Sequence, residues 1–188
     1  HPQVISCALA GWTEQFVWTS WLGDVPEELN TPDSWGNNWQ VFLDDLSSRP
    51  NKDLGQKSWH LDVATPGAAI VGPYKPYLSY NVGYYYVWGT SMSAPHVSGM
   101  AALVLQSYPS FGQKAMEAIL KNAAHGLPIP SDGSWVYDPW YGVYHFEWFG
   151  DDWGSGFLQA DTALFAAWTR SRGYSMSGAG TSEVDIQK

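Results

Sequence analysis

The sequence predicts a domain that combines strands and helices, and three observations carry this prediction. Residues 3–10 form a short, apolar and partly β-branched run, which is typical of a buried strand. Residues 61–71 form a second strand-like run around a Pro-Gly break. The second half of the chain carries three helical patterns, of which residues 91–108 are the clearest. The 188 residues, 45% of them apolar, suffice for one domain with a core.

Long connections separate the two strand segments and follow the second one. Residues 11–59 are rich in tryptophan, acidic residues and turn formers, so we expect a surface excursion with scattered apolar anchors. Residues 73–87 are rich in tyrosine, which favours a loop that includes at most a short edge strand.

The first two helices have recognisable ends. Pro95 falls in the first turn of the helix over residues 91–108, where a missing N–H costs nothing, and Pro109 ends it. Small residues lie nearly all round this helix, so we expect it to be packed tightly inside the protein. Ser110 and Gln113 predict a capping box for the next helix. That helix carries an apolar stripe made of Ala115, Met116, Ile119, Leu120 and Ala123.

The remainder of the chain predicts a hairpin and a third helix. Residues 133–153 are strongly aromatic and alternate on both sides of a turn at 138–142, which indicates a β-hairpin. Residues 154–170 predict a strand stub followed by a helix. Residues 173–188 are small and polar, so we expect a flexible tail.

Charge and composition exclude several classes of function. The chain has 18 acidic and 9 basic residues, a net charge of −9, which argues against a nucleic-acid partner and against an anionic membrane surface. An acidic surface with few lysines suits a secreted protein. No apolar run approaches the length of about 18 residues that a membrane span needs.

The single cysteine, Cys7, rules out an internal disulfide. It lies in an apolar run, which favours a small buried residue, with a catalytic thiol as the alternative. The sequence has no signal peptide pattern and opens on His1 and Pro2 without a methionine, so we expect a processed or shortened chain.

The stretch WGTSMSAPHVSGMAALVL, residues 88–105, raises the question of whether Ser91 is a nucleophile. A Gly-Thr-Ser turn that leads into a helix places the serine at the helix N-terminus, and Gly89 allows a positive φ there. Free N–H groups and the positive end of the helix dipole can stabilise an oxyanion at this point. Alternatively, Ser91 only caps the helix, which is the commoner role of a serine in this place.

The same stretch resembles the serine block of subtilisin-like serine proteases, whose pattern reads GTSMAxPHVAG. Other segments resemble this family in the same order. HPQVISCALAG resembles the strand before the block, LDVATPGAAI resembles the segment that contains APG (here ATPG), and SFGQKAMEAILKNAA resembles the helix that follows the block. GSGFLQADTAL resembles the family's GxGxxxAxxAL ending.

The resemblance implies a fold and a nucleophile. Residues 1–172 would be the C-terminal half of an α/β, three-layer sandwich with a mostly parallel sheet, completed by another chain. Ser91 would be the nucleophile, with its own backbone N–H in the oxyanion hole. The cleft would be lined by Trp88, Gly89 and Thr90. His96 belongs to the serine motif, and the resemblance implies a structural role for it instead of that of a general base.

The family's aspartate, histidine and oxyanion-asparagine segments do not occur in these 188 residues. The other histidines lack a flank that suggests a base; they are His1, His60, His125 and His145. A serine without its base is nearly inactive, and half of a parallel sheet would leave a long edge exposed. We therefore expect the N-terminal portion of the same protease, as a separate chain, to complete the domain.

Residues 11–59 and 129–153 are longer than the family pattern and are interpreted as insertions. Their aromatic side chains either pack on the core and brace the split domain, or form a docking surface for a protein or a glycan. An exposed cluster would support the second interpretation; its members would be Trp135, Trp140, Tyr144 and Trp148.

Two functions are compatible with the sequence. The first is a secreted or cell-surface endopeptidase that hydrolyses protein or peptide substrates by acyl transfer to Ser91 and requires no cofactor. Asp62 lies near a position where some family members bind a cation, so calcium is an optional stabilising ligand and the metal question stays open. The alternative is an inactive, protease-derived structural or binding module of a surface assembly.

Overall fold

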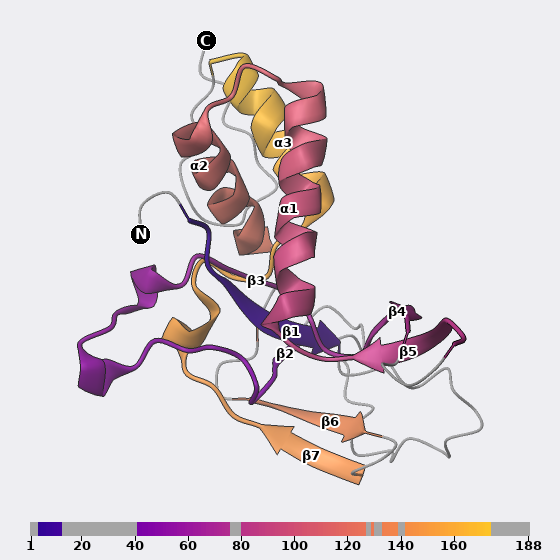
Figure 1. The fold of residues 1–188 in the computed structure, drawn as a ribbon. Coiled ribbons are helices and arrows are strands. Elements are labelled where there is room, and N and C mark those ends of the chain that lie inside the picture. Colours follow the sequence, from indigo (N-terminus) through magenta and orange to yellow (C-terminus); the bar gives the residue numbers. More distant parts are fainter. Residues whose placement is uncertain are drawn as a thin grey trace, which may run out of the picture.

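The computed structural model describes residues 4–12, 41–75, 80–126, 129, 133–138 and 142–173. Three helices pack together on one side of a small sheet, and two hairpins lie at its other side and end (Figure 1). The helices are α1 (Thr90–Ser107), α2 (Gln113–Ala123) and α3 (Ala160–Ser171), and the 3-10 turns are η3 (Lys52–Leu54), η4 (Ser58–His60), η5 (Ala124–Gly126) and η6 (Gly150–Trp153). The strands are β1 (Cys7–Trp12), β2 (Val41–Leu43), β3 (Val63–Pro66), β4 (Ile70–Tyr74), β5 (Gly83–Val87), β6 (Ser134–Asp138) and β7 (Gly142–Phe146).

The central sheet has the order β2-β1-β3. β1 runs parallel to β3, with Cys7 opposite Val63, and its far end pairs antiparallel with β2. The predicted strand stub forms a further parallel bridge between Phe157 and Ala64 on β3. The mixed α/β class predicted from the sequence is confirmed.

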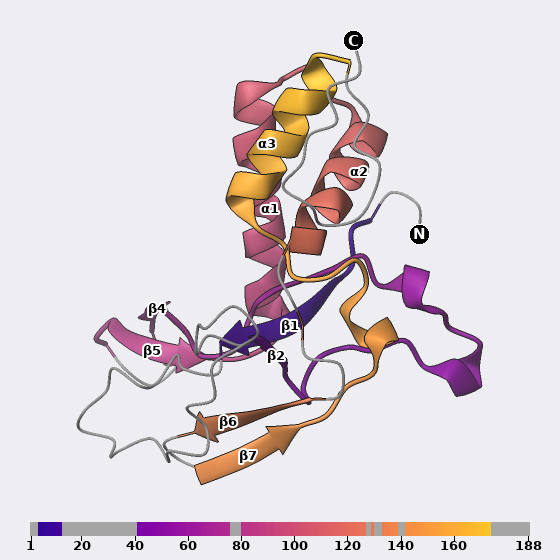
Figure 2. The same ribbon diagram turned by 180° about the vertical axis from the view of Figure 1, so that it is seen from behind.

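Two cores lie on opposite faces of this sheet. α1, α2 and α3 enclose a core on one face, which contains Val97, Val104, Leu120 and Ala167. The other face is covered by aromatic side chains: Phe42 of β2 stacks on Phe146 of β7 with ring centroids 4.9 Å apart. Figure 2 shows the β6–β7 hairpin on the side of the sheet opposite to the helices. The sheet is therefore the middle of three layers.

Of the aromatic cluster predicted to be exposed in the second insertion, the structure describes two side chains, and one of them is buried. Trp148 is 2% exposed and packs edge-on against Trp153 at 5.4 Å, because it fills the core below the sheet. Tyr144 is exposed, and its hydroxyl donates a hydrogen bond to Asp45 of the first insertion. Trp140 and the side chain of Trp135 lie outside the described residues. The described aromatic residues of the insertions thus include packed side chains and exposed ones, such as Trp59 at 71% and Phe149 at 72%, and the choice between packing and docking stays a prediction.

The helix of the serine motif differs from its prediction. α1 begins at Thr90, and only Ser93, Val97 and Val104 are buried along its 18 residues. Its opposite face, which includes Ala94 and Ala102, is exposed in the described part of the chain. The prediction that this helix is buried all round was wrong for this chain, because β1, β3, α2 and α3 contact it and leave its other side exposed.

Other elements can also be compared with their predictions. The capping box of α2 was wrong: the N-cap is Gly112, because Ser110 lies in the turn where Phe111 stacks on Tyr108. The tyrosine-rich segment contains β5, which pairs antiparallel with β4, so the short strand that its sequence allowed is present. The hairpin around 138–142 and the apolar stripe of α2 are confirmed. The predicted tail is residues 173–188, and all of it except Gly173 lies outside the described part.

Candidate active site

The residue before α1 has a backbone conformation that favours glycine. Gly89 is the N-cap residue, with φ 143° and ψ 159°. Residues other than glycine rarely adopt these backbone angles. Its N–H donates to the carbonyl of Gly67 at 3.1 Å. Ser91 is therefore the second helical residue, and the alternative that it caps the helix is wrong.

The polar groups of Ser91 are available. The residue is exposed, and none of the hydrogen bonds within the described part of the chain uses its hydroxyl. The next N–H, of Met92, is taken by the Gly89 carbonyl at 2.9 Å. The N–H of Ser91 remains one of the donors that a helix N-terminus leaves open, and the helix dipole favours an anion there.

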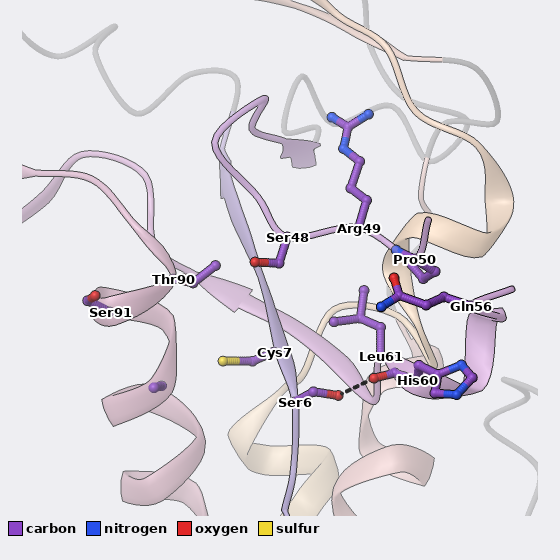
Figure 3. Close-up of a pocket in the computed structure, with 11 residues that line it drawn as sticks. Ser6, Cys7, Ser48, Arg49, Pro50, Gln56, His60, Leu61, Thr90 and Ser91 are labelled. Atoms are coloured by element: carbon purple, nitrogen blue, oxygen red, sulfur yellow. Dashed lines mark hydrogen bonds between the residues drawn. The ribbon is translucent and has the colours of Figure 1, made fainter. Parts of the chain in front are cut away.

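Ser91 is among the residues that line a groove of about 540 Å³ (Figure 3). Thr90, Ser91 and Ala94 of α1 form one wall, and Cys7 of β1 and the preceding Ser6 form the floor. The opposite wall comes from the first insertion and the segment after it: Ser48, Arg49, Pro50, Gln56, His60 and Leu61.

Of the three residues expected to line the cleft, the structure places one in the groove and two outside it. Thr90 lines the groove beside Ser91, whereas Trp88 and Gly89 are not among its lining residues. Trp88 is half-buried, lies 6.4 Å from the ring of Tyr86 and packs against the core below the sheet. Sequence reasoning missed the groove wall from Ser48 to Leu61, since no local motif marks it.

None of the described histidines is hydrogen-bonded to Ser91. The ring of His60 lies across the groove, where its Nδ1 accepts a hydrogen bond from the Lys57 N–H at 2.9 Å. The Nδ1 of His96 lies 2.8 Å from the carbonyl of Met92, one turn back on α1. His125 is exposed at η5, and His145 pairs loosely with Glu147 at 3.6 Å. His1 lies outside the described residues.

Asp62, the residue considered for a metal ion, forms an ion pair with a lysine side chain. Its carboxylate lies 2.6 Å from the Lys121 ammonium and accepts a hydrogen bond from the Ser6 N–H at 2.8 Å. Burial alone would raise the pKa of Asp62, but the hydrogen bonds from Lys121 and Ser6 hold it below its ordinary value. No group of three or more His, Cys, Asp or Glu side chains gathers for a metal among the described residues.

Cys7 is half-buried, and its Sγ points across the groove floor toward α1 (Figure 3). Burial raises the pKa of this thiol above its ordinary value. A thiol with a raised pKa is less ionised at neutral pH and is a poorer nucleophile. The environment therefore does not favour the alternative of a catalytic thiol.

A sequence profile described as the subtilase family matches residues 42–174. The chain belongs to the subtilase family. It is 37% identical over 83 residues to the extracellular serine protease of Serratia marcescens, covering 44% of this chain and 8% of that one. It is 42% identical over 101 residues to M-protease of Shouchella clausii, covering 53% of this chain and 24% of that one.

One solved structure supports the fold of this subtilase chain. Fervidolysin from Fervidobacterium pennivorans, a keratinolytic enzyme related to subtilisin, superposes with a TM-score of 0.50 and 21% identity. The match covers 88% of this chain and 19% of fervidolysin. The chain thus spans less than a quarter of the length of these relatives. In the described part, no helix combines the length and apolarity needed to cross a membrane.

Proposed function

We propose that this subtilase chain carries the nucleophile of a secreted serine endopeptidase. The Ser91 Oγ attacks a peptide carbonyl carbon, and a histidine takes its proton and passes it to the departing amine as the C–N bond breaks. Water then hydrolyses the acyl-serine ester and frees Ser91. The N–H of Ser91 and an asparagine side chain hold the oxyanion during both steps. The proposed reaction uses no cofactor.

One observation carries this proposal. Ser91 is exposed in the first turn of α1 and lines a groove, and no hydrogen bond within the described part of the chain uses its hydroxyl. By contrast, the hydroxyl of Ser93, two residues later, is buried and donates to a carbonyl within the protein. Secretion is supported by relatives such as the extracellular serine protease of Serratia marcescens.

The proposal includes a partner. The N-terminal portion of the same protease, as a separate chain, supplies the aspartate, histidine and asparagine and covers the open face of α1. This face carries small and apolar side chains, which allow close approach of another element; among them are Ala94, Ala102, Leu103 and Leu105. Leu103 and Leu105 are 44% and 39% exposed, which is unfavourable unless something covers them.

A fluorophosphonate probe tests the nucleophile. Native material is treated and its intact mass is measured, with Ser91→Ala as the matched control. We expect one adduct on this chain, none on the control, and a second chain in the same complex. A folded two-chain complex without an adduct would favour the inactive binding module instead.

Substitution on the open face tests the partner. Ala102→Glu places a charge where the second chain is proposed to pack, and Ala160→Glu adds the same charge to the exposed start of α3 as a control. We expect the second chain to be lost from purified Ala102→Glu and retained with Ala160→Glu. Equal retention in both would contradict the proposed packing.

A further inference from the structure

Two buried hydroxyl groups join the end of β3 to the first turn of α1. The Thr65 hydroxyl donates a hydrogen bond to the Ser93 carbonyl at 3.0 Å, and the Ser93 hydroxyl donates one to the Thr65 carbonyl at 3.3 Å. Both residues are fully buried. The hydrogen bonds run in both directions, so each side chain satisfies the other residue's carbonyl. We name this pair the Thr65–Ser93 bridge.

Both members of the bridge depart from the family pattern. The serine block reads GTSMA in the pattern and GTSMS here, so that Ser93 stands where an alanine is usual. The APG segment reads TPG here, so that Thr65 stands where an alanine is usual. The two positions are 28 residues apart, yet the hydroxyl of each donates to the carbonyl of the other.

The bridge lies beside the nucleophile. Ser93 follows Ser91 by two residues in the same helical turn, and Gly89 precedes it by two. Gly67, two residues after Thr65, accepts the Gly89 N–H, and a Cβ at Gly67 would collide with the Ser93 Oγ and lie 2.9 Å from the Gly89 carbonyl oxygen. The end of β3 therefore holds the turn of Ser91 both before and after that residue.

We propose that Thr65 and Ser93 are positioning residues that fix the nucleophile turn on the sheet. Ser91 keeps its own hydroxyl and N–H free for the reaction, so its orientation has to come from its neighbours. The bridge supplies this restraint from a buried site in which an unpaired hydroxyl or carbonyl is costly. The inference rests on the proposed role of Ser91 as nucleophile.

The test is a double-mutant cycle in the complete protease. The variants are Thr65→Val, Ser93→Ala and the double variant, with Thr65→Ser as the conservative variant that keeps the hydroxyl. Thr169→Val is the matched control, because Thr169 is also buried and its hydroxyl also donates to a carbonyl, that of Ala166 at 2.9 Å, but within α3. The readouts are the phosphonylation rate constant of Ser91, kcat, KM and the unfolding midpoint.

We expect Thr65→Val and Ser93→Ala each to lower the phosphonylation rate constant and kcat by about tenfold with KM unchanged, since a small misplacement of a reacting group is enough for this. Thr65→Ser keeps the parent values. Thr169→Val lowers the unfolding midpoint but leaves both rates unchanged. The double variant loses less than the product of the two single losses, because the two residues share one interaction.

Several results would overturn the inference. Rates of Thr65→Val equal to those of the parent would do so, as would losses that multiply in the double variant. If Thr65→Val does not fold, Ser93→Ala and Thr65→Ser decide the matter on the same readouts. If the parent takes no adduct at Ser91, the proposed function fails and the positioning role with it. In that case coupling in the unfolding midpoints still decides whether the bridge exists.

Discussion

Replacing Lys121 by methionine removes the cation of Asp62 and keeps most of the apolar length of the side chain. Asp62 is 7% exposed and belongs to the segment that enters β3, whereas Lys121 lies in the last turn of α2. The pair therefore ties the helical layer to the sheet. Lys114→Met, at an exposed position on the same helix, is the matched control.

The size of the effect follows from what remains around the carboxylate. Breaking a fully buried ion pair by removing one partner costs about 3–5 kcal/mol. Here the Lys121 side chain is 31% exposed, and Ser6 still donates its N–H and its hydroxyl to Asp62. We therefore expect Lys121→Met to lower the free energy of unfolding by about 2 kcal/mol at pH 7, with almost no change for Lys114→Met.

The pH dependence gives the sharper test. The pKa of Asp62 is lowered in the folded protein, so its contribution to stability is present above the unfolded pKa and is lost as the pH falls through the folded pKa. Urea unfolding is measured at pH 7 and at pH 2. The difference between the parent and Lys121→Met should shrink at the lower pH. A difference that is unchanged at pH 2, or no larger than that of Lys114→Met at pH 7, would refute the reasoning.

Three further predictions concern the core, the helix start and the thiol. Trp148→Ala should cost about 3–5 kcal/mol in urea unfolding because it empties a site below the sheet, whereas Phe149→Ala, at a side chain 72% exposed, should cost far less; similar losses would contradict the assigned core. Gly89→Ala should lower the free energy of unfolding by about 1–3 kcal/mol and slow phosphonylation of Ser91, because alanine is strained at φ 143°. An unchanged phosphonylation rate, measured by intact mass in samples quenched at successive times, would contradict this. Cys7 should react with iodoacetamide more slowly at pH 7 than a free thiol and faster as the pH rises, because its pKa is raised; mass spectrometry showing full labelling at the free-thiol rate at pH 7 would contradict this.

The elements that the sequence predicted well are those with local signals. Pro95, the small residues after it and Pro109 located α1 within one residue at its start, and alternation around 138–142 located the β6–β7 hairpin. The position of Ser91 at a helix N-terminus followed from the Gly-Thr-Ser turn. These features depend on residues close together in the chain, so a pattern along the sequence contains them.

The features that escaped prediction depend on residues far apart. The pairing of Asp62 with Lys121, the Thr65–Ser93 bridge and the groove wall opposite Ser91 each join segments that no motif connects. The capping box at Ser110 failed for a different reason: Phe111 stacks on Tyr108 and keeps the serine in the preceding turn. A tertiary contact there prevailed over a local preference.

The layer below the sheet is built from two segments that lie far apart in the chain. β2 of the first insertion stacks on β7 of the second, Tyr144 bonds to Asp45, and Arg49 donates to the Glu147 carbonyl at 2.8 Å. Neither segment can be shortened alone without leaving the apolar side of the other in water. Transplanting this layer onto another subtilase, or deleting it, is therefore a change of two loops at once. The ancestry of the two loops should likewise show them gained and lost together.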